Sequence, residues 1–543
     1  MLPLLSVAQM RACDEYTIHQ KGIASQILME RAAHAAIEVL YAETTLGMTD
    51  TTKIIVLCGC GNNGGDGFAM ARFLFEEGVD TVVCYAGEWK DNAPDMDKMS
   101  VECARQYTLW RECSGKTLDS LPAYMTEYRT KPTIVIDALF GIGLCRKITG
   151  KAAEWITQIA HHPDTPVLAI DVPSGVDADS GRIPSVALRA TVTATMGALK
   201  QGLALYPAAE FAGKIRVCDI GISPDVLLEI PDEKPIHRWC LTEDTDIADI
   251  LYRPPHGHKG TFGRVVVIGG SYGMCGAPYF AAKSAYRAGS GIVEIFTDDE
   301  NRIPLQTLLP EAVLTLFTPK TLPSDHDFMR LFDRADSVVL GCGLGQSDAA
   351  YCIVEATLRL CTKPLVLDAD ALNLIAAHKP LQALMTARNT PTVITPHVGE
   401  AARLTRLTAA DMAMDPFASS SALARQYNAV CVLKDARTVI SDGGNHHLTQ
   451  THGNSGMATG GSGDCLAGLI GALLAKTRHY PDALPVFTAA GAVLIHALAG
   501  DRAAARLGQC AVMASDIADA IGEILRDHPW PLPRYHAERP SNF

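Results

Sequence analysis

The pattern of apolar and polar positions predicts helices first and then strands that alternate with helices. Residues 6–40 carry apolar side chains at helical spacing, with Ser6 and Ser25 as expected N-caps. Short apolar runs follow at 52–58, 80–86, 132–141, 166–175 and 190–197, separated by helical segments. Strands separated by helices predict a parallel sheet covered on both faces, with function at the carboxyl ends of the strands.

A second series of the same kind begins at residue 263. Its apolar runs lie at 263–270, 290–297, 336–345, 363–373, 390–400, 428–435 and 438–444. Between the two series, prolines and acidic residues around 225–240 interrupt any periodicity. We therefore predict an α/β protein with one domain at 1–225, a linker at 226–240 and a second domain at 241–543.

Composition narrows the class of protein. The chain of 543 residues exceeds what one hydrophobic core usually serves, and its 47 basic and 60 acidic residues give a net charge of -13. Such a charge repels nucleic-acid backbones and anionic membranes. The 16 cysteines show no zinc-finger spacing, and neither a signal peptide nor a membrane-spanning run is evident. We expect a soluble cytoplasmic protein with reduced thiols and no nucleic-acid or membrane partner.

The segment "LCGCGNNGGDGFAMARFL", residues 57–74, places glycines and asparagines between an expected strand and an expected helix. Backbone amides of such a loop, together with the helix N-terminus, favour an anion. The segment matches neither the dinucleotide fingerprint nor the P-loop, because Asn62 and Asn63 occupy the turn and no Gly-Lys-Ser follows. A phosphate cradle, a metal site and a plain left-handed turn all remain open.

Polar residues follow two further strands of the first series. Asp137 ends one strand, and Asp171 and Ser174 follow another. Because the carboxyl ends of parallel strands meet at one edge, Asn63, Asp137 and Ser174 are expected to converge there. Their oxygen atoms suit an alkali or alkaline-earth cation. The alternative for each aspartate is a helix cap.

Four motifs of the first half, "GCGNNGGDG", "DALFGIGL", "DVPSGVD" and "TMGALKQGL", together resemble the N-terminal epimerase domain of the bifunctional NAD(P)H-hydrate repair enzymes. The resemblance spans residues 1–225 and implies a Rossmann-like three-layer fold, a potassium ion and a hydrated nicotinamide dinucleotide as substrate. It implies that Asn63, Asp137 and Ser174 hold the potassium ion. By the same resemblance the substrate contacts Asn62, Asn63, Gly64, Gly65, Asp66, Gly141, Ile142, Gly143, Leu144, Cys145, Arg146, Lys147 and Asp171.

The reaction implied for the first half explains these residue types. Water adds across the 5,6 double bond of the reduced nicotinamide and leaves a hydroxyl-bearing carbon of R or S configuration. Interconversion requires ring opening or proton transfer at that centre, for which the Asp171 carboxylate is a suitable acid/base. Lys200 is expected to be a cationic helper near the ring, the alternative being an exposed lysine after a strand.

The second half contains "GNSGMATGGSGDCLAGLIGALLA", a glycine-rich loop that runs into an apolar helix beginning near Asp464. The loop amides and the helix dipole favour an anion there. A carboxylate beside bound phosphates is placed to deprotonate a hydroxyl that attacks phosphorus. The "GGSGD" sequence resembles the signature of ribokinase-like folds.

Further motifs, among them "GCGLGQ", "LDADALN", "ITPHVGE" and "VLKDARTVI", resemble the dehydratase domain of the same family over residues 241–530. The resemblance implies a ribokinase-like fold and phosphorylation of the hydrate, with Asp464 as the base. The hydrate would contact Ala277, Gly343, His397 and Asp464, and the nucleotide would contact Lys434, Asp435, Ala436, Arg437, Thr438 and Gly463. Four polar residues follow expected strands: Asp368, Asp370, Asn373 and Glu400. They either bind the phosphates or a divalent ion, or they cap helices. For His397 the alternative is a loop histidine whose ring is satisfied by backbone.

We therefore predict a metabolite-repair enzyme that epimerises hydrated NADH and NADPH and dehydrates the S epimer with ADP and Mg²⁺, giving AMP and phosphate. We expect a homo-oligomer. One alternative is a ribokinase-like kinase of a small alcohol fused to a nucleotide-binding module, which would release a stable phosphorylated product. A second alternative is a first domain that senses a ligand and only regulates its neighbour.

Overall fold

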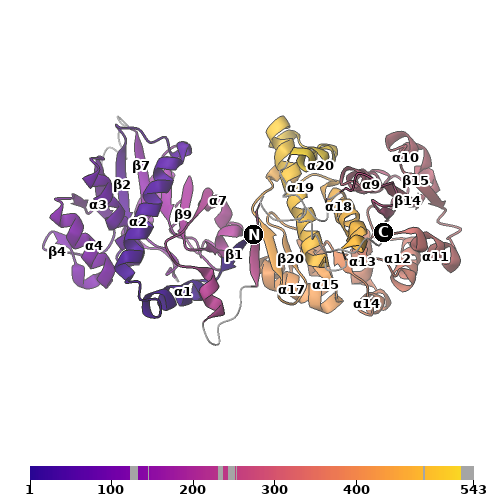
Figure 1. Cartoon of the computed structure of the whole chain (residues 1–543), viewed down its shortest axis with the longest axis horizontal. Helices are drawn as coiled ribbons and strands as arrows, with labels where there is room; N and C mark the ends of the chain where they lie inside the picture. The colour runs from indigo at the N-terminus through magenta and orange to yellow at the C-terminus, as the bar shows by residue number, and fades with distance from the viewer. Residues whose placement is uncertain are drawn as a thin grey trace. The chain divides into compact units, whose positions relative to one another are not determined.

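The structure is a computed structural model, and it describes residues 1–122, 132–144, 146–229, 237–242, 251, 253–480 and 483–527. The chain forms two compact units, an N-terminal unit of Leu2–Arg238 and a C-terminal unit that begins at Trp239. Figure 1 shows the helices and strands of both units. Part of the expected linker at 226–240 lies outside the described residues, so the domain limits stay a prediction.

The N-terminal unit is built on a parallel sheet of order β11-β9-β8-β7-β2-β3-β6. Its strands are β2 (Lys53–Cys58), β3 (Thr81–Tyr85), β6 (Thr117–Leu118), β7 (Thr133–Ala138), β8 (Val167–Ile170), β9 (Val192–Met196) and β11 (Lys214–Cys218). Outside this seven-strand order, β1 (Leu2–Leu5) pairs in parallel with β10 (Leu199–Lys200). A short antiparallel pair joins β4 (Trp89–Lys90) to β5 (Ala93–Pro94).

Helices cover both faces of the N-terminal sheet because its strands are apolar on both faces. In β2, Ile54 and Val56 pack in one hydrophobic cluster while Ile55 and Leu57 pack in another. The first cluster contains residues of α1 (Val7–His19), α2 (Ser25–Ala42), α3 (Asn62–Glu76) and α4 (Val101–Glu112), and the second those of α6 (Gly150–Ala160). A short helix, α7 (Ala208–Ala212), precedes β11. The expected three-layer α/β arrangement is confirmed.

The N-terminal helices begin partly as expected. Ser6 is the N-cap of α1 and forms a capping box with Gln9. Ser25 is instead the first residue of α2, and its hydroxyl donates a hydrogen bond to Glu102. The prediction of Ser25 as a cap is wrong because the helix starts one residue earlier than the cap pattern suggests.

The C-terminal unit contains a sheet of order β12-β21-β20-β19-β18-β17-β16-β13-β14-β15. These strands are β12 (Arg238–Leu241), β13 (Arg264–Ile268), β14 (Ile292–Asp298), β15 (Val313–Phe317), β16 (Ser337–Leu340), β17 (Leu365–Leu367), β18 (Thr392–Ile394), β19 (Val430–Leu433), β20 (Val439–Ser441) and β21 (His447–Gln450). The pairs from β19 to β15 are parallel, whereas β20 is antiparallel to both of its neighbours β19 and β21.

Two helical layers cover this sheet. One apolar cluster contains residues of α9 (Gly276–Arg287), α18 (Ser462–Lys476), α19 (Pro485–Leu507) and α20 (Ala514–Asp527). The other face carries α11 (Asp325–Arg334), α12 (Asp348–Leu360), α13 (Ala369–Ala377), α14 (Lys379–Thr386), α15 (Val398–Thr405), α16 (Ala409–Met414) and α17 (Pro416–Tyr427). Helix α10 (Arg302–Leu308) lies between β14 and β15 in sequence. The second unit is therefore also α/β, as predicted.

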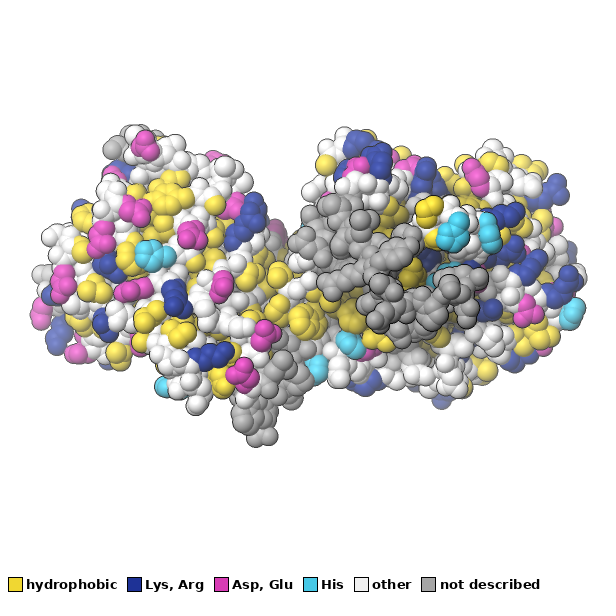
Figure 2. Space-filling model, in the orientation of Figure 1, with side chains coloured by type: hydrophobic (Ala, Val, Ile, Leu, Met, Phe, Trp, Pro, Cys, Tyr) yellow, Lys and Arg dark blue, Asp and Glu magenta, His cyan; other side chains and the backbone are white. Residues whose placement is uncertain are grey.

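The surface carries charges of both signs. Figure 2 shows Asp and Glu side chains interspersed with Lys and Arg on the visible face of the N-terminal unit. Among the described helices, none combines the length and the hydropathy needed to cross a membrane.

Two candidate active sites

The glycine-rich segment of the N-terminal unit leads directly from β2 into α3, which begins at Asn62. None of its glycines has a positive φ, so the left-handed turn considered from the sequence is wrong. The asparagines lie in the first helical turn. Glycine is required here for close approach: a Cβ on Gly59 would lie 2.1 Å from the carbonyl oxygen of Leu139, and one on Gly64 would lie 1.9 Å from that of Gly59.

A cavity of about 810 Å³ opens beside this segment. The expected substrate residues that line it are Asn62, Asn63, Asp66, Gly141, Ile142, Gly143, Leu144, Arg146 and Asp171, and Lys200 lines it too. Gly64 and Gly65 are buried within α3, and Lys147 is exposed. Cys145 lies outside the described residues. The volume is within the range of small-molecule sites.

Asp171 and Lys200 form a buried ion pair in this cavity. Lys200 Nζ lies 2.6 Å from Asp171 Oδ1, and the two side chains are 1% and 14% exposed. The ammonium group also donates to Thr195 Oγ1 and to the carbonyl oxygen of Met196. The exposed-lysine alternative for Lys200 is therefore wrong. Asp171 has a φ of 69°, and its Oδ2 accepts a hydrogen bond from the amide of Ile142 at 3.2 Å.

Asp137 and Ser174 meet as expected. The Ser174 hydroxyl donates to Asp137 Oδ1 at 2.6 Å and the Ser174 amide donates to Oδ2 at 2.7 Å. Asp137 lies inside β7 and caps no helix. Burial raises its pKa to about 6, although the bonds from Ser174 and Leu139 partly offset that rise.

The Asn63 amide is buried, and among the described residues neither its oxygen nor its nitrogen has a hydrogen-bond partner. Its Cγ lies 3.3 Å from the position that a Cβ on Gly141 would take. A buried amide oxygen with no donor is costly unless a ligand satisfies it. Together with the oxygens of Asp137 and Ser174, this amide oxygen would give a set of hard oxygen donors, which suits an alkali or alkaline-earth cation.

The sequence did not indicate Asp14 as a site residue. Asp14 lies in α1 and lines the same cavity as Asp171 and Lys200. Its pKa is raised to about 6: burial is the largest cause, Asp171 and Glu15 also raise it, and Lys200 lowers it. In the sequence, Asp14 is an aspartate within an expected helix, and such residues ordinarily face solvent.

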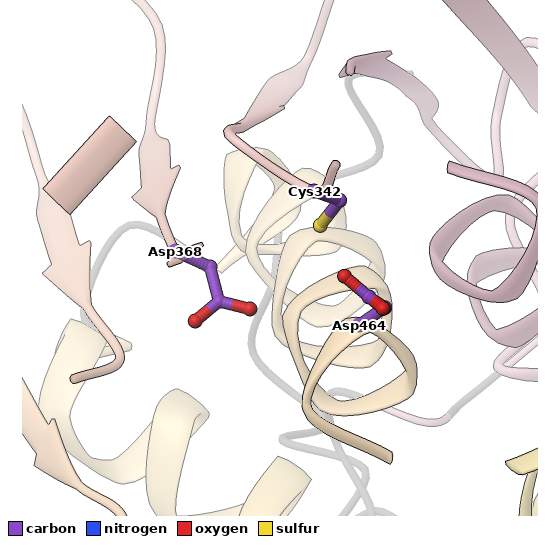
Figure 3. A group of neighbouring side chains, drawn as sticks. All are labelled: Cys342, Asp368 and Asp464. Atoms are coloured by element: carbon purple, nitrogen blue, oxygen red, sulfur yellow. The ribbon is translucent and has the colours of Figure 1, made fainter. Parts of the chain in front are cut away.

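The C-terminal site is centred on Asp464, in the first turn of α18. The helix begins at Ser462, close to the expected position, and its N-cap Gly461 has a φ of 95°. Ligand atoms of Asp464, Cys342 and Asp368 lie within 4.8 Å of one another. Figure 3 shows the three side chains converging from the helix, from the loop after β16 and from the end of β17.

The electrostatic surroundings of Asp464 set its protonation. Burial raises its pKa to about 6 and nearby Asp368 raises it too, whereas a hydrogen bond with the Cys342 thiol and the charge of Lys434 lower it. A carboxyl with a pKa near neutrality suits an acid/base role. Cys342 belongs to the "GCGLGQ" motif, and the sequence predicts no role for it. The structure shows that its thiol forms a hydrogen bond with Asp464.

Lys434 and Gly463 lie beside this acidic group. Lys434 Nζ donates to Asp368 Oδ1 at 2.7 Å, and it lies 3.2 Å from the position of a Cβ on Gly463. Asp368 occupies the N-cap position of α13 but makes no cap hydrogen bond, and Thr395 donates to it instead. Thus Lys434 reaches the acidic group, while Asp435 to Thr438 form the loop between β19 and β20.

The other residues expected in the C-terminal site bind mainly to neighbouring protein groups. His397 caps α15: its Nδ1 accepts from the amide of Gly399, as in the backbone-satisfied alternative. Glu400 completes this capping box, and burial raises its pKa to about 7. Asn373 accepts from Arg403, and Asp370 accepts from the amide of Gly345. Ala277 and Gly343 lie side by side, because a Cβ on Gly343 would be 2.9 Å from that of Ala277.

Comparison with known proteins shows two family matches along the chain. Residues 25–202 match the family described as YjeF-related protein N-terminus, and residues 265–523 match the family described as NAD(P)H-hydrate dehydratase. The first match contains Asp171 and Lys200, and the second contains the group around Asp464.

Curated relatives extend over both units. The bifunctional NAD(P)H-hydrate repair enzyme Nnr of Coxiella burnetii is 33% identical over 95% of this chain and 98% of its own length. The Escherichia coli protein of that name is 32% identical over 93% of this chain and 90% of its own length. Among solved structures, the ADP/ATP-dependent NAD(P)H-hydrate dehydratase from Bacillus subtilis, crystallised with ATP and Mg²⁺, is 25% identical and covers 53% of this chain and 97% of its own, with a TM-score of 0.46.

Proposed function

This chain belongs to the family of bifunctional NAD(P)H-hydrate repair enzymes, and we propose from that premise how its two sites divide the work. The N-terminal unit interconverts the R and S hydrates of NADH and NADPH. The C-terminal unit then dehydrates the S epimer with ADP, releasing AMP and phosphate. The observation that carries the proposal is that both sites are present in one chain: a cavity holding the Asp171–Lys200 pair and a carboxylate, Asp464, at the start of α18.

In the N-terminal unit, the hydrate lies in the 810 Å³ cavity with its hydroxyl-bearing ring near Asp171. Asp171 Oδ1 is neutralised by Lys200, while Oδ2 accepts only from the Ile142 amide among the described residues and is placed to exchange a proton with the substrate. The Lys200 ammonium group is held by Thr195 and Met196 and in turn binds the Asp171 carboxylate. The buried pair thus fixes the position of the reacting oxygen.

A potassium ion in this unit is part of the proposal. Asn63, Asp137 and Ser174 would hold it, and the unpartnered Asn63 amide supports that fit. The ion supplies a fixed positive charge at the edge of the sheet. Asn62 to Asp66 and Gly141 to Lys147 would then contact the dinucleotide beside it, apart from the two glycines buried in α3.

In the C-terminal unit, Asp464 takes the proton from the hydrate's hydroxyl as that oxygen attacks the terminal phosphorus of ADP. Phosphorylation converts the hydroxyl into a good leaving group, and loss of phosphate restores the double bond. The helix N-terminus at Gly461 to Gly463 faces the developing charge with its amides.

The nucleotide would contact Lys434 to Thr438 and Gly463, and Ala277, Gly343 and His397 would contact the hydrate. Mg²⁺ bound with the nucleotide would neutralise phosphate charge. Asp368 is the carboxylate proposed for it, because one of its oxygens lies within 4.8 Å of ligand atoms of Asp464 and Cys342. The hydrogen bonds that Asp368 accepts from Lys434 and Thr395 both go to Oδ1. The cytoplasmic location and the homo-oligomeric state stay predictions.

The experiment that tests the proposal identifies the products. Purified protein receives S hydrate with ADP or with ATP, and inorganic phosphate, the nucleotide product and reduced cofactor are quantified. We expect AMP, phosphate and reduced cofactor in equal amounts with ADP. A phosphorylated hydrate that accumulates would instead support the kinase alternative, which the bifunctional relatives do not favour. Asp464→Asn is the matched inactive control.

A further inference from the structure

The carboxyl group of Asp14 differs from that of Asp171, which lines the same cavity, and from that of Asp137 in how it is held. Asp171 is held by Lys200 and Ile142, and Asp137 is held by Ser174 and Leu139. Within the part of the chain that the structure describes, Asp14 has neither a hydrogen bond nor an ion pair. It comes from the middle of α1, whereas Asp171 follows β8, so the two carboxyls enter the cavity from different walls.

Folding does not account for an aspartate at this position. Aspartate is a poor residue in a helix interior, and a partly buried carboxyl without a partner costs free energy. Asp14 caps no helix, since the N-cap of α1 is Ser6. A side chain that costs stability and faces a ligand cavity is a candidate for function.

The charges around Asp14 keep its proton exchangeable near neutral pH. Burial, Asp171 and Glu15 raise its pKa to about 6, whereas Lys200 lowers it. On α3, Asp66 also lines the cavity, and burial raises its pKa too. The other charged groups that line the cavity are Arg11, Glu102 and Arg146.

Ring opening of the hydrate needs two proton-transfer groups. One group takes the proton from the hydroxyl oxygen as the bond between the ring carbon and the ring nitrogen breaks, which leaves an aldehyde. The electron pair of that bond goes to the nitrogen, which receives a proton from the second group. Rotation of the aldehyde and the reverse steps close the ring with the opposite configuration, so each group regains its starting state.

We propose that Asp14 is a second catalytic acid/base residue of the N-terminal site, exchanging a proton with the bound hydrate from α1 while Asp171 exchanges the other. This inference rests on the proposed epimerase function. The Asp14 carboxyl has no ion pair to break before it loses or gains a proton, whereas Asp171 exchanges its proton through Oδ2 while its Oδ1 stays paired with Lys200.

The test uses the full chain and purified R hydrate without any nucleotide, so that dehydration does not occur. Formation of the S epimer is followed by chromatography against an enzyme-free control. We expect Asp14→Asn to lower kcat about 100-fold while KM changes much less. Asp14→Glu should recover part of the rate, and the inflection of the wild-type profile of kcat/KM against pH near pH 6 should be lost in Asp14→Asn.

Two controls separate catalysis from structure. Asp164→Asn removes an exposed carboxylate that does not line the cavity and should leave kcat unchanged. The melting temperature of Asp14→Asn should equal or exceed that of the wild type, whereas a structural role would lower it. The proposal is overturned if Asp14→Asn keeps its kcat within about two-fold of an active wild type. If the wild type itself does not exceed the enzyme-free rate, the epimerase function fails and this proposal fails with it.

Discussion

Lys200 Nζ and Asp171 Oδ1 lie 2.6 Å apart at the wall of the N-terminal cavity, with the lysine side chain only 1% exposed. Lys200 belongs to β10, and Asp171 follows β8 in a left-handed backbone conformation with a φ of 69°. A strained, buried pair of opposite charges is costly to form and is retained where its geometry serves a site. The pair therefore supports the role that we propose for Asp171 in epimerisation.

Replacing the lysine tests that pair. We expect Lys200→Met to lower the free energy of unfolding of the N-terminal unit by about 3–5 kcal/mol, because Asp171 would remain buried without a cation. Epimerisation should be lost, while dehydration of S hydrate should persist. Urea unfolding with hydrogen exchange to identify each unit measures the first effect. Lys53→Met, which removes a more exposed pair with Asp80, should cost less than about 1 kcal/mol.

Potassium should stabilise the N-terminal unit. Since Asn63 has a buried amide without a partner, an ion that binds its oxygen stabilises only the folded state. We expect KCl to raise the free energy of unfolding of this unit by about 1–2 kcal/mol over choline chloride at equal ionic strength. Asn63→Leu should remove the difference between the two salts. An equal response to both salts in the wild type would contradict the site.

The glycines of segment 57–74 should differ in how strongly an alanine substitution destabilises the fold. A Cβ on Gly64 would overlap the carbonyl of Gly59, so Gly64→Ala should cost about 2–3 kcal/mol or more. Gly61 has open space at its Cβ position and a φ of -91°. Gly61→Ala should therefore cost less than about 1 kcal/mol. Similar stabilities of the two variants in thermal unfolding would refute the close-approach explanation.

Dehydration should depend on pH through Asp464. Because the base must be ionised, the rate with S hydrate and ADP should rise with pH through an inflection near 6 and then level off. The Cys342 thiol lowers the pKa of Asp464 by a hydrogen bond. Cys342→Ala should therefore move the inflection upward, to about pH 6.5–7. A downward shift would contradict the assigned role of the thiol.

The same carboxyl links stability to pH. Folding raises the pKa of Asp464 from 3.8 to about 6, so the folded state binds more protons in this interval and the free energy of unfolding falls as pH rises across it. Asp464→Asn removes that cost. We expect the variant to be more stable than the wild type at pH 7 by about 1–3 kcal/mol, measured by denaturant unfolding. Lower stability at pH 7 would contradict the burial argument.

The sequence predicted the fold class and most parallel strands because their apolar runs are bounded by turn residues. It did not predict β1, β10 or β15 (Leu2–Leu5, Leu199–Lys200 and Val313–Phe317). Of these, β10 has only two residues, too few for a periodic signal. The convergence of Asp137 with Ser174 followed from sheet geometry, which places successive strand ends at one edge.

The sequence did not predict which side chains from distant elements would contact one another. Burial of Lys200 depends on Thr195, Met196 and Asp171 closing around its ammonium group. Asp14 reaches the cavity only because α1 packs over it, and a helix pattern does not say which strand ends its side chains face. The roles assigned to the substrate and nucleotide residues stay predictions.

The most direct test of two linked activities in one chain starts from pure R hydrate with ADP and Mg²⁺. We expect complete recovery of reduced cofactor by the wild type and accumulation of S hydrate by Asp464→Asn. With Asp137→Asn, R hydrate should be converted no faster than without enzyme. No recovery from R hydrate, under conditions in which S hydrate is fully restored, would contradict the central claim.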